Sequence, residues 1–344
     1  YAVTGSDGKT TTTTLIYEML KQEGYNCYLG GNIGTPLIDK VEDIKSDDKV
    51  VLELSSFQLL TMKSSPHIAV ITNLSPNHLD IHSSMEEYVD AKKNIYKYQI
   101  NSGRTILNYD NAITRTFIKE VKGKLVLFST QQECENGAFL KQNRIFYREN
   151  KYDKEIMPVD QIKLPGMHNV ENMLAAICAV IPEVSIKCIT NVAKNFSGVE
   201  HRNEFVCSVN GVSFYNDSIG SSPTRTAATI KAFKDKVILI AGGYDKNLCY
   251  NDLGEIIHNH VKSMVLLGDT ADKIEHSYKM YLDKSHNSSI PVMRAKNMED
   301  AVNQAYRLAE SGDAVILSPA SASFDLYSNF MERGNHFKEI VNGL

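Results

Sequence analysis

The chain has 344 residues, of which 42% are hydrophobic, so it is long and apolar enough for about two domains with separate cores. Its formal net charge of −4 and pI near 6.2 argue against a nucleic-acid partner, which usually binds a basic face. Six cysteines are scattered without a CxxC pair, which fits neither a zinc site nor a disulfide framework and favours a reducing cytoplasm.

The apolar runs and the first residues of the chain set two further expectations. No apolar run approaches the length of a membrane span and there is no signal peptide, so we expect a protein without a membrane span. The chain opens in the middle of a predicted strand and without a Met, so we expect that a further segment preceded it.

The opening stretch is typical of a strand, a tight turn and a helix. Residues 2–3 indicate the end of a buried strand, and apolar residues recur at helical spacing over 12–20. The glycines between them therefore fall on a strand-to-helix turn. The turn carries the short GxxGKT pattern, because Val3 stands where the full phosphate-loop pattern has a glycine.

This turn has the chemistry of a phosphate-binding loop. Gly5 and Gly8 allow backbone N–H groups to converge on an anion at a helix N-terminus. Lys9 supplies a mobile positive charge, and the Thr10 hydroxyl can ligate the Mg²⁺ that accompanies ATP. An ordinary turn is the alternative, and the position between strand and helix favours phosphate binding.

The rest of the first half alternates strands and helices. Continuous apolar runs at 50–54 and 68–73 are typical of parallel strands buried on both faces. We expect further strands at 25–29, 105–108 and 125–128, a small antiparallel insertion at 137–148, and helices at 84–98, 170–181 and 186–196. The domain boundary is predicted at 197–199.

The second half begins with a hairpin and then returns to alternating strands and helices. The run 204–215 alternates around Asn210-Gly211, a strong signal for a two-residue hairpin turn. Strands are expected at 237–241, 264–268, 291–294 and 314–318, followed by a terminal helix from about Asp325. The sequence thus predicts an α/β protein with a P-loop-type, mostly parallel sheet in 1–198 and a smaller, Rossmann-like α/β domain in 199–344.

Three further residues are candidates for chemistry. Glu53 lies within an apolar strand, where a carboxylate is rarely tolerated without a partner, so function is favoured over a structural role. His78 is equally compatible with a surface loop or a ligand, and the nearby Asn73 and Asp80 favour a ligand. Lys92, taken alone, is an ordinary solvated lysine on a helix.

In the light of these residues, the chain resembles the Mur ligase family over essentially its whole length. The motifs that carry the resemblance are, in order, GSDGKTT (5–11), GGNIG (30–34), LELSSFQL (52–59), NLSPNHLD (73–80), AK (91–92), PGMHN (165–169), HR (201–202), NDS (216–218) and SPASAS (318–323). ELSSFQL, GNIG and the RG at 333–334 are most similar to the D-glutamate-adding members. No DNPR-like stretch of the diaminopimelate- or lysine-adding members is present.

The resemblance implies an ATP-dependent ligase of peptidoglycan precursor synthesis. A carboxylate of UDP-N-acetylmuramoyl-L-alanine would attack ATP to give an acyl phosphate, and the amine of D-glutamate would then displace phosphate. The resemblance implies two Mg²⁺ ions, the first held by Thr10 and Glu53 and the second by Glu53 and His78. Lys92 matches the lysine that this family carries as a carbamate made with CO₂, so Lys9, His78 and Lys92 are the implied catalytic residues. We expect a cytoplasmic monomer.

The resemblance also implies binding residues in both domains. ATP would be bound by Gly5, Ser6, Asp7, Gly8, Lys9, Thr10, Thr11, Asn169, Arg202 and Asp217. For Asn169, a local role as a helix N-cap is an equally strong alternative. The other substrates would be bound by Asn32 and Ser55 near the muramoyl-alanine, and by Ser221, Lys246, Ser323, Phe324 and Phe330 at D-glutamate. For Phe330, a position in the core is equally plausible.

Two departures from the family pattern and two alternatives accompany this interpretation. Ile219 stands where the family commonly has a lysine, and no residues match the family's N-terminal domain, which holds the uridine diphosphate. We therefore expect the chain as given to bind ATP but to hold its acceptor poorly. The alternatives are a ligase like folylpolyglutamate synthetase, and a nucleotide-binding module or inactive paralogue. A GTPase is disfavoured because the chain lacks an NKxD stretch.

Overall fold

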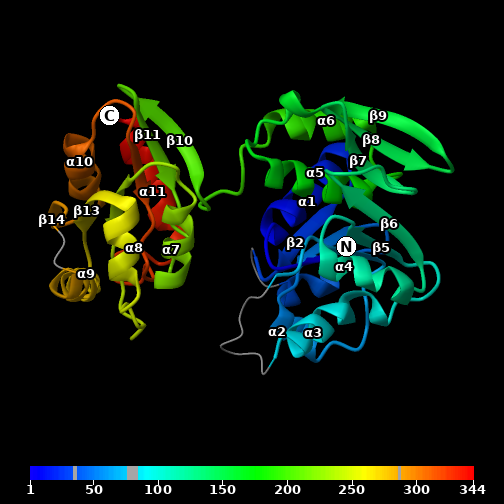
Figure 1. Cartoon of the computed structure of the whole chain (residues 1–344), viewed down its shortest axis with the longest axis horizontal. Coiled ribbons are helices and arrows are strands. Elements are labelled where there is room, and N and C mark those ends of the chain that lie inside the picture. Colours follow the sequence, from blue (N-terminus) through cyan, green and yellow to red (C-terminus); the bar gives the residue numbers. More distant parts are fainter. Residues whose placement is uncertain (34–36, 76–83, 286–287) are drawn as a thin grey trace. The chain divides into compact units, whose positions relative to one another are not determined.

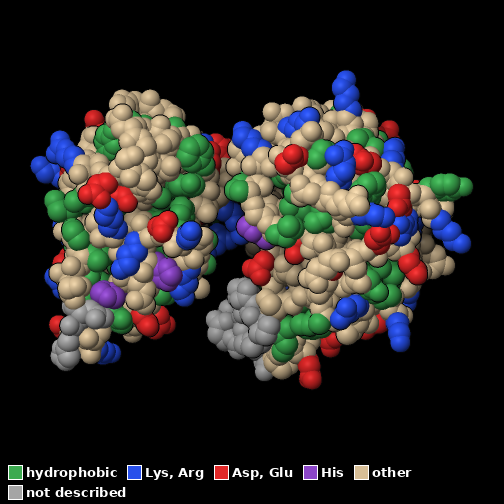
Figure 2. Space-filling model, turned by 45° about the horizontal axis from the view of Figure 1, so that its top comes forward, with side chains coloured by type: hydrophobic (Ala, Val, Ile, Leu, Met, Phe, Trp, Pro, Cys, Tyr) green, Lys and Arg blue, Asp and Glu red, His purple; other side chains and the backbone are tan. Residues whose placement is uncertain are grey.

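The computed structural model describes residues 1–33, 37–75, 84–285 and 288–344 (Figure 1). The chain divides into two compact units, Tyr1–Ser197 and Gly198–Leu344. The division falls one residue before the predicted boundary. In the described part of the chain, no helix is long and apolar enough to cross a membrane. Acidic and basic side chains are interspersed on the face of each unit drawn in Figure 2.

The first unit is built on a nine-stranded sheet of order β2-β3-β1-β4-β5-β6-β7-β8-β9. The strands are β1 (Ala2–Thr4), β2 (Cys27–Gly31), β3 (Lys49–Glu53), β4 (Ile68–Ile71), β5 (Arg104–Asn108), β6 (Lys124–Ser129), β7 (Gly137–Lys141), β8 (Arg144–Glu149) and β9 (Tyr152–Pro158). Strands β2 to β7 in this order run parallel, and β8 and β9 pair antiparallel at one edge. Strand β1 lies between β3 and β4, so the turn that follows it lies next to the carboxyl ends of both neighbours.

Helices cover both faces of this sheet. They are α1 (Lys9–Glu23), α2 (Ser56–Leu60), α3 (Met85–Lys97), α4 (Ala112–Thr116), α5 (Met167–Val180) and α6 (Ile186–Asn195), with 3₁₀ turns at Ile38–Asp43, Phe117–Glu120 and Val159–Gln161. Apolar residues of α1, α5 and α6 form one core with the sheet, and those of α3 contribute to a second core. Helices on both faces of a mostly parallel sheet confirm the predicted α/β class.

The predicted antiparallel insertion is part of the main sheet. Strand β7 pairs in parallel with β6, and β8 and β9 extend the same sheet beyond it. Strand β9 was not predicted because its first four residues are exposed. It therefore lacks the apolar alternation that marks a half-buried strand.

The second unit has a six-stranded sheet of order β10-β11-β15-β12-β13-β14. Its strands are β10 (Glu204–Val209), β11 (Val212–Asn216), β12 (Val237–Ala241), β13 (Val261–Leu266), β14 (Val292–Arg294) and β15 (Ala314–Leu317). The predicted hairpin joins β10 and β11, with positive φ angles at Asn210 (52°) and Gly211 (82°). The other pairs are parallel.

Helices also cover both faces of the second sheet. They are α7 (Pro223–Lys231), α8 (Leu253–His260), α9 (Ala271–Ser285), α10 (Met298–Leu308) and α11 (Phe330–Asn342). One core involves α7, α8 and α9, and the other involves α10 and α11. The terminal helix begins at Phe330 instead of about Asp325, because the Asn329 side chain caps it by accepting a hydrogen bond from the Glu332 backbone N–H.

A buried arginine holds the C-terminal end of α5 against the first sheet. Arg104, on β5, donates hydrogen bonds to the carbonyl oxygens of Ala179 and Ile181 and is only 7% exposed. These carbonyls belong to the last turn of a helix, which has no further intrahelical donors for them and attracts positive charge.

We predict that Arg104→Met lowers the free energy of unfolding by about 1–3 kcal/mol, because it leaves two carbonyls without their charged donor. Urea denaturation measures the change. The matched control is Arg115→Met, at an exposed position on α4, which should change the free energy by less than about 0.5 kcal/mol. Equal unfolding midpoints for the two variants would contradict the role of Arg104.

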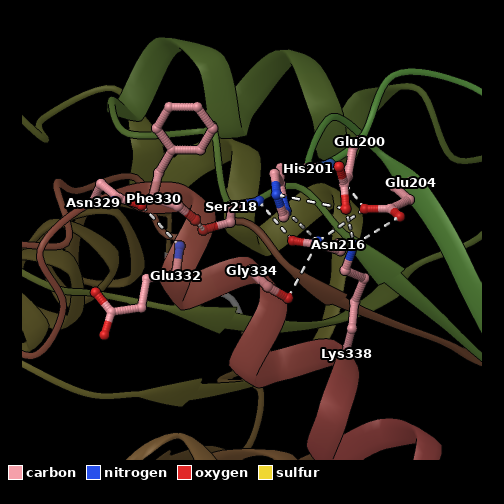
Figure 3. Close-up of polar contacts among 10 residues, drawn as sticks. All are labelled: Glu200, His201, Glu204, Asn216, Ser218, Asn329, Phe330, Glu332, Gly334 and Lys338. Atoms are coloured by element: carbon pink, nitrogen blue, oxygen red, sulfur yellow. Dashed lines mark hydrogen bonds and ion pairs between the residues drawn. The ribbon is translucent and has the colours of Figure 1, made fainter. Parts of the chain in front are cut away.

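The loop that opens the second unit is anchored by a buried histidine (Figure 3). His201 has a left-handed φ of 62°, and its Nδ1 lies 2.9 Å from Asn216 Nδ2. Because Asn216 Oδ1 already accepts the Ser218 N–H, the Asn216 amide nitrogen is the donor and His201 Nδ1 carries the lone pair. A Cβ on Gly334 would lie 2.3 Å from His201 Nδ1, which explains a glycine in the middle of α11.

We expect this contact to make the protein less stable in mild acid. Burial lowers the pKa of His201, as does the charge of Lys338, whereas the carboxylates of Glu200 and Glu204 raise it. As the pH falls, His201 therefore takes up a proton in the unfolded chain before it does so in the folded chain. The contribution of His201 to the free energy of unfolding is fully present above about pH 6.5 and is lost as the pH falls through the pKa of His201 in the folded chain. His201→Gln should flatten this dependence in urea titrations. The exposed control His276→Gln should leave it unchanged.

Candidate active site

The turn predicted to bind phosphate lies between β1 and α1, and it requires both of its glycines. Gly5 has a φ of 152° and Gly8 a φ of 75°. A Cβ on Gly5 would lie 1.9 Å from Thr72 Oγ1, and one on Gly8 would lie 2.1 Å from Asn172 Oδ1. Both positions therefore need a residue without a side chain, for space as well as for conformation.

Polar contacts from β4 and α3 fix the turn. The Ser6 hydroxyl lies 2.9 Å from Tyr88 Oη, and the Asp7 backbone N–H donates to Asn73 Oδ1 at 2.9 Å. Thr72 Oγ1 donates to the Asp7 carbonyl at 2.6 Å. The Ser6 side chain is thus engaged inside the protein, so its predicted contribution to ATP binding would come from the backbone.

Lys9 folds back over the turn that it follows. Its Nζ donates to the carbonyl oxygens of Gly5 at 2.9 Å and Ser6 at 2.7 Å. Next to it, the buried Thr10 stands in the first turn of α1, and the exposed Asp7 and half-buried Thr11 lie on either side of this pair. The N-terminal end of α1 and Lys9 together make this turn electropositive.

Glu53 is a buried carboxylate, and only one of its two oxygens has a hydrogen-bond partner among the described residues. It ends β3, is 2% exposed, and accepts a hydrogen bond from Asn32 Nδ2 on Oε1 at 2.8 Å. Its Oε2 is buried and has no hydrogen-bond partner among the described residues. A buried carboxylate oxygen without a donor is costly unless a cation or another donor approaches it, so this atom fits a metal ligand.

Lys92 is a buried amine directly beneath the turn. It lies on α3, is 2% exposed, and donates from Nζ to Thr4 Oγ1 at 3.1 Å and to the Gly5 carbonyl at 2.9 Å. Burial, and next the charge of Lys9, lower the pKa of Lys92 to about 7, although Glu53 acts in the opposite direction. The expectation for a lone lysine, a solvated side chain on a helix surface, is wrong here.

The residues present therefore fit a site for a hard cation. Hydroxyl and carboxylate oxygens are the ligands that Mg²⁺ prefers, and Thr10 and Glu53 supply them. His78, the third expected ligand, lies outside the described residues. Within the described ranges, no group of three His, Cys, Asp or Glu side chains could hold a metal by itself.

The alternative role of Asn169 as a helix N-cap is wrong. Helix α5 begins at Met167 with Gly166 as its N-cap, and Asn169 lies inside the first turn. Its Nδ2 donates to the Pro165 carbonyl at 2.8 Å, and its Oδ1 accepts from Asn172 Nδ2 at 3.2 Å. Contact between Asn169 and ATP stays a prediction.

Asn172, on α5, packs against this turn and was not predicted from the sequence. It lies one helical turn after Asn169, is 6% exposed, and its Oδ1 accepts from Thr12 Oγ1 at 3.4 Å. Two asparagines three residues apart share one face of a helix, and this spacing is the signal that could have identified it.

Ser55 has a local structural role in addition to the predicted one. Its hydroxyl caps α2 by accepting the Gln58 backbone N–H at 3.2 Å, and the Gln58 side chain accepts the Ser55 backbone N–H at 2.9 Å. This reciprocal pair is a capping box, which the sequence analysis did not recognise. Proximity of Ser55 to a substrate stays a prediction.

In the second unit, the two predicted nucleotide contacts are neighbours. Arg202 is exposed, and its charge acts on Asp217, whose pKa is raised by burial. The Asp217 carboxylate accepts hydrogen bonds from Ser318 Oγ at 2.7 Å and Thr229 Oγ1 at 2.8 Å. Asp217 thus ties the end of β11 to the end of β15, and Arg202 is the member of the pair that faces solvent.

Most of the predicted D-glutamate residues gather at the end of β15. The Nζ of the exposed Lys246 lies 5.1 Å from the centre of the Phe324 ring. Phe324 directly follows the buried Ser323 in the chain. Phe330 is half-buried and packs edge-to-face on His201, with ring centroids 5.9 Å apart, which partly supports the core alternative (Figure 3). Ser221 is half-buried beside Gly220, which packs against Asp217 and Ser318.

Comparisons with known proteins identify both units. Residues 3–180 match the family model described as the Mur ligase middle domain, and residues 201–321 match the one described as Mur ligase, glutamate ligase domain. The chain is 59% identical to a UDP-N-acetylmuramoylalanine–D-glutamate ligase of Acetivibrio thermocellus and 52% identical to that of Ruminiclostridium cellulolyticum. Each alignment covers 100% of this chain and 74% of the relative.

Solved structures agree on the fold. MurF from Acinetobacter baumannii matches with a TM-score of 0.65 at 17% identity, over 98% of this chain and 76% of that one. UDP-N-acetylmuramate-alanine ligase from Thermotoga maritima matches with a TM-score of 0.59 at 17% identity, over 100% of this chain and 75% of that one. With two family models matched in order and relatives that share more than half of its residues, the chain belongs to the Mur ligase family.

Proposed function

We propose that this chain forms the ATP-binding and amino-acid-binding units of a ligase that joins D-glutamate to UDP-N-acetylmuramoyl-L-alanine, with release of ADP and phosphate. The relatives at 59% and 52% identity carry the name of this activity. The observation that carries the proposal is the set of Lys9, Glu53 and Lys92 around the turn after β1, of which Glu53 and Lys92 are buried. We further propose that the enzyme acts as a cytoplasmic monomer.

The chemistry requires two anions to meet. A substrate carboxylate must approach the terminal phosphate of ATP, and two unit charges about 4 Å apart repel by about 4 kcal/mol at an effective dielectric near 20. Lys9 and the backbone N–H groups at the start of α1 would hold the phosphates and offset part of this repulsion. The carboxylate attack would form the acyl phosphate and release ADP.

Bound Mg²⁺ supplies further charge neutralisation in this reaction. Thr10, Glu53, His78 and a carbamate of Lys92 would hold two such ions. The buried Lys92 amine suits this role because a pKa near 7 leaves much of it neutral at physiological pH. A neutral amine can attack CO₂ and lose a proton, which turns a cationic side chain into an anionic oxygen ligand. An ordinary lysine would remain protonated.

The amino acid would bind at the carboxyl edge of the second sheet. Lys246 would meet the D-glutamate side-chain carboxylate, with help from Ser221, and the backbone N–H groups of Ser323 and Phe324 would take the other carboxylate. Phe330 would close the pocket, Asn32 and Ser55 would lie near the muramoyl-alanine, and Asn169, Arg202 and Asp217 would serve the nucleotide. Ile219 offers no charge where the family commonly has a lysine, so Lys246 would be the main cation.

The proposed activity predicts phosphate release that requires three substrates together. The intact protein that contains this chain should release phosphate with ATP, UDP-N-acetylmuramoyl-L-alanine and D-glutamate, and should be silent when D-glutamate is replaced by L-glutamate. A coupled phosphate assay measures this. Turnover with a folate acceptor, and none with the muramoyl acceptor, would refute the proposal. ATP binding without any ligation would instead indicate a nucleotide-binding module.

For the carbamate, Lys92→Ala should lower turnover by about two orders of magnitude or more, because an oxygen ligand of the metal site is lost. ATP binding, measured by calorimetry, should change little. The matched control is the neighbouring Lys93→Ala, which removes an ion pair with Glu120 and should keep turnover near that of the wild type. Protein equilibrated with ¹³C-bicarbonate should show a carbamate resonance that Lys92→Ala lacks. Normal turnover of Lys92→Ala would rule the role out.

A further inference from the structure

A second buried arginine lies behind the loop at the end of β15. Arg333, in the first turn of α11, is 3% exposed. Its Nη1 donates to the carbonyl oxygens of Ala322 at 2.8 Å and Ser321 at 3.1 Å, and its Nη2 donates to those of Ser218 at 2.8 Å and Ser321 at 3.1 Å. Nε donates to Ser218 Oγ at 3.0 Å. Every one of these acceptors is an uncharged oxygen.

These contacts fix the direction of one particular peptide group. The Ala322 carbonyl accepts from Arg333 and also from the Tyr244 backbone N–H at 3.0 Å, so it points into the protein. In a trans peptide, the N–H of the next residue points the opposite way. The Ser323 N–H is therefore turned away from Arg333. Neither it nor the Phe324 N–H donates a hydrogen bond to any residue that the structure describes.

Close packing leaves this peptide little freedom to rotate. A Cβ on Gly243 would lie 2.3 Å from the Ala322 carbonyl oxygen and 3.1 Å from Arg333 Nη1. The preceding residue is held as well, because Ser321 Oγ lies 2.6 Å from Thr270 Oγ1 and 2.9 Å from Tyr250 Oη. The loop is thus braced from the inside, and the Ser323 N–H is held in one direction.

The guanidinium also brings a positive charge that forms no salt bridge with a carboxylate of the described residues, although Asp325 and Asp217 lie close enough to act on it. Burial lowers the pKa of Arg333 to about 10, so the side chain remains a cation at neutral pH. Asp325 and Asp217 stabilise the cation from a distance, but among the described residues its hydrogen bonds go only to uncharged oxygens of Ser218, Ser321 and Ala322. A buried cation without a paired carboxylate favours an anion on the far side of the loop.

We infer that Arg333 is a positioning residue for the acceptor amino acid: it aims the Ser323 N–H outward and places a positive charge behind it, so that this loop binds a carboxylate of D-glutamate. The inference rests on the proposed function, because it identifies what prepares the amino-acid site of that function. Arg333 itself does not touch the substrate, since its five N–H groups face inward.

The test compares Michaelis constants in the intact protein. Arg333→Met should raise KM for D-glutamate by about tenfold or more, because the charge is lost and the peptide is free to turn. KM for ATP should rise by a smaller factor than KM for D-glutamate, because most of the predicted nucleotide contacts belong to the turn after β1, and only Asp217 and Arg202 lie near the Ser218 carbonyl that Arg333 binds. Arg333→Lys should recover part of the loss, because it keeps the charge but not the fork of donors. A merely structural role would lower the active fraction and leave KM for D-glutamate unchanged.

Two further variants keep the test decisive if Arg333→Met does not fold. Ser218→Ala removes the hydroxyl that accepts from Arg333 Nε and should raise KM for D-glutamate by a smaller factor. Arg104→Met is the matched control, because it removes another buried guanidinium that binds backbone carbonyls and should leave this KM unchanged. An unchanged KM for D-glutamate in folded Arg333→Lys and Ser218→Ala, with normal wild-type turnover, would overturn this inference alone. Absence of wild-type turnover with D-glutamate would overturn the proposed function and this inference together.

Discussion

The first unit is organised around charged groups that the protein interior would normally exclude. Glu53 and Lys92 are both 2% exposed, yet they do not neutralise each other in an ion pair. The Glu53 Oε2 atom has no donor among the described residues, and burial and the charge of Lys9 favour the neutral form of the Lys92 amine. Such an arrangement is destabilising by itself, so the surrounding packing must hold it in place.

The fold supplies that packing through the position of β1. This strand lies between β3 and β4, with β3 carrying Glu53 at its end and β4 leading into Thr72 and Asn73. Because the carboxyl ends of parallel strands meet at one edge, residues far apart in sequence converge on the phosphate turn. The second unit repeats this principle, since the ends of β11, β12 and β15 bring together the residues around Asp217 and Ser321.

The sequence predicted the elements that have a strong period or a specific turn. Buried strands and the Asn210-Gly211 hairpin follow from patterns that local sequence contains. It could not predict β9, whose exposed residues lack apolar alternation, or the start of α11 at Phe330, which depends on the Asn329 cap. The burial of Lys92 could not be predicted either, because a lysine on a helix is usually solvated. Only the hydrogen bond from Lys92 to the Gly5 carbonyl shows that this side chain is inside the protein.

Arg104 and Arg333 illustrate why burial and hydrogen bonding do not by themselves distinguish structural residues from positioning residues. Both are buried guanidinium groups that donate to backbone carbonyls. The carbonyls bound by Arg104 end a helix, and the hydrogen bonds simply complete that helix. The Ala322 carbonyl bound by Arg333 belongs to a peptide whose N–H points away from Arg333 and has no acceptor among the residues that the structure describes. The two arginines therefore differ in the peptide groups that they hold. The peptide held by Arg333 has an N–H on its far side that can donate to a ligand, whereas the carbonyls held by Arg104 belong to the end of a helix.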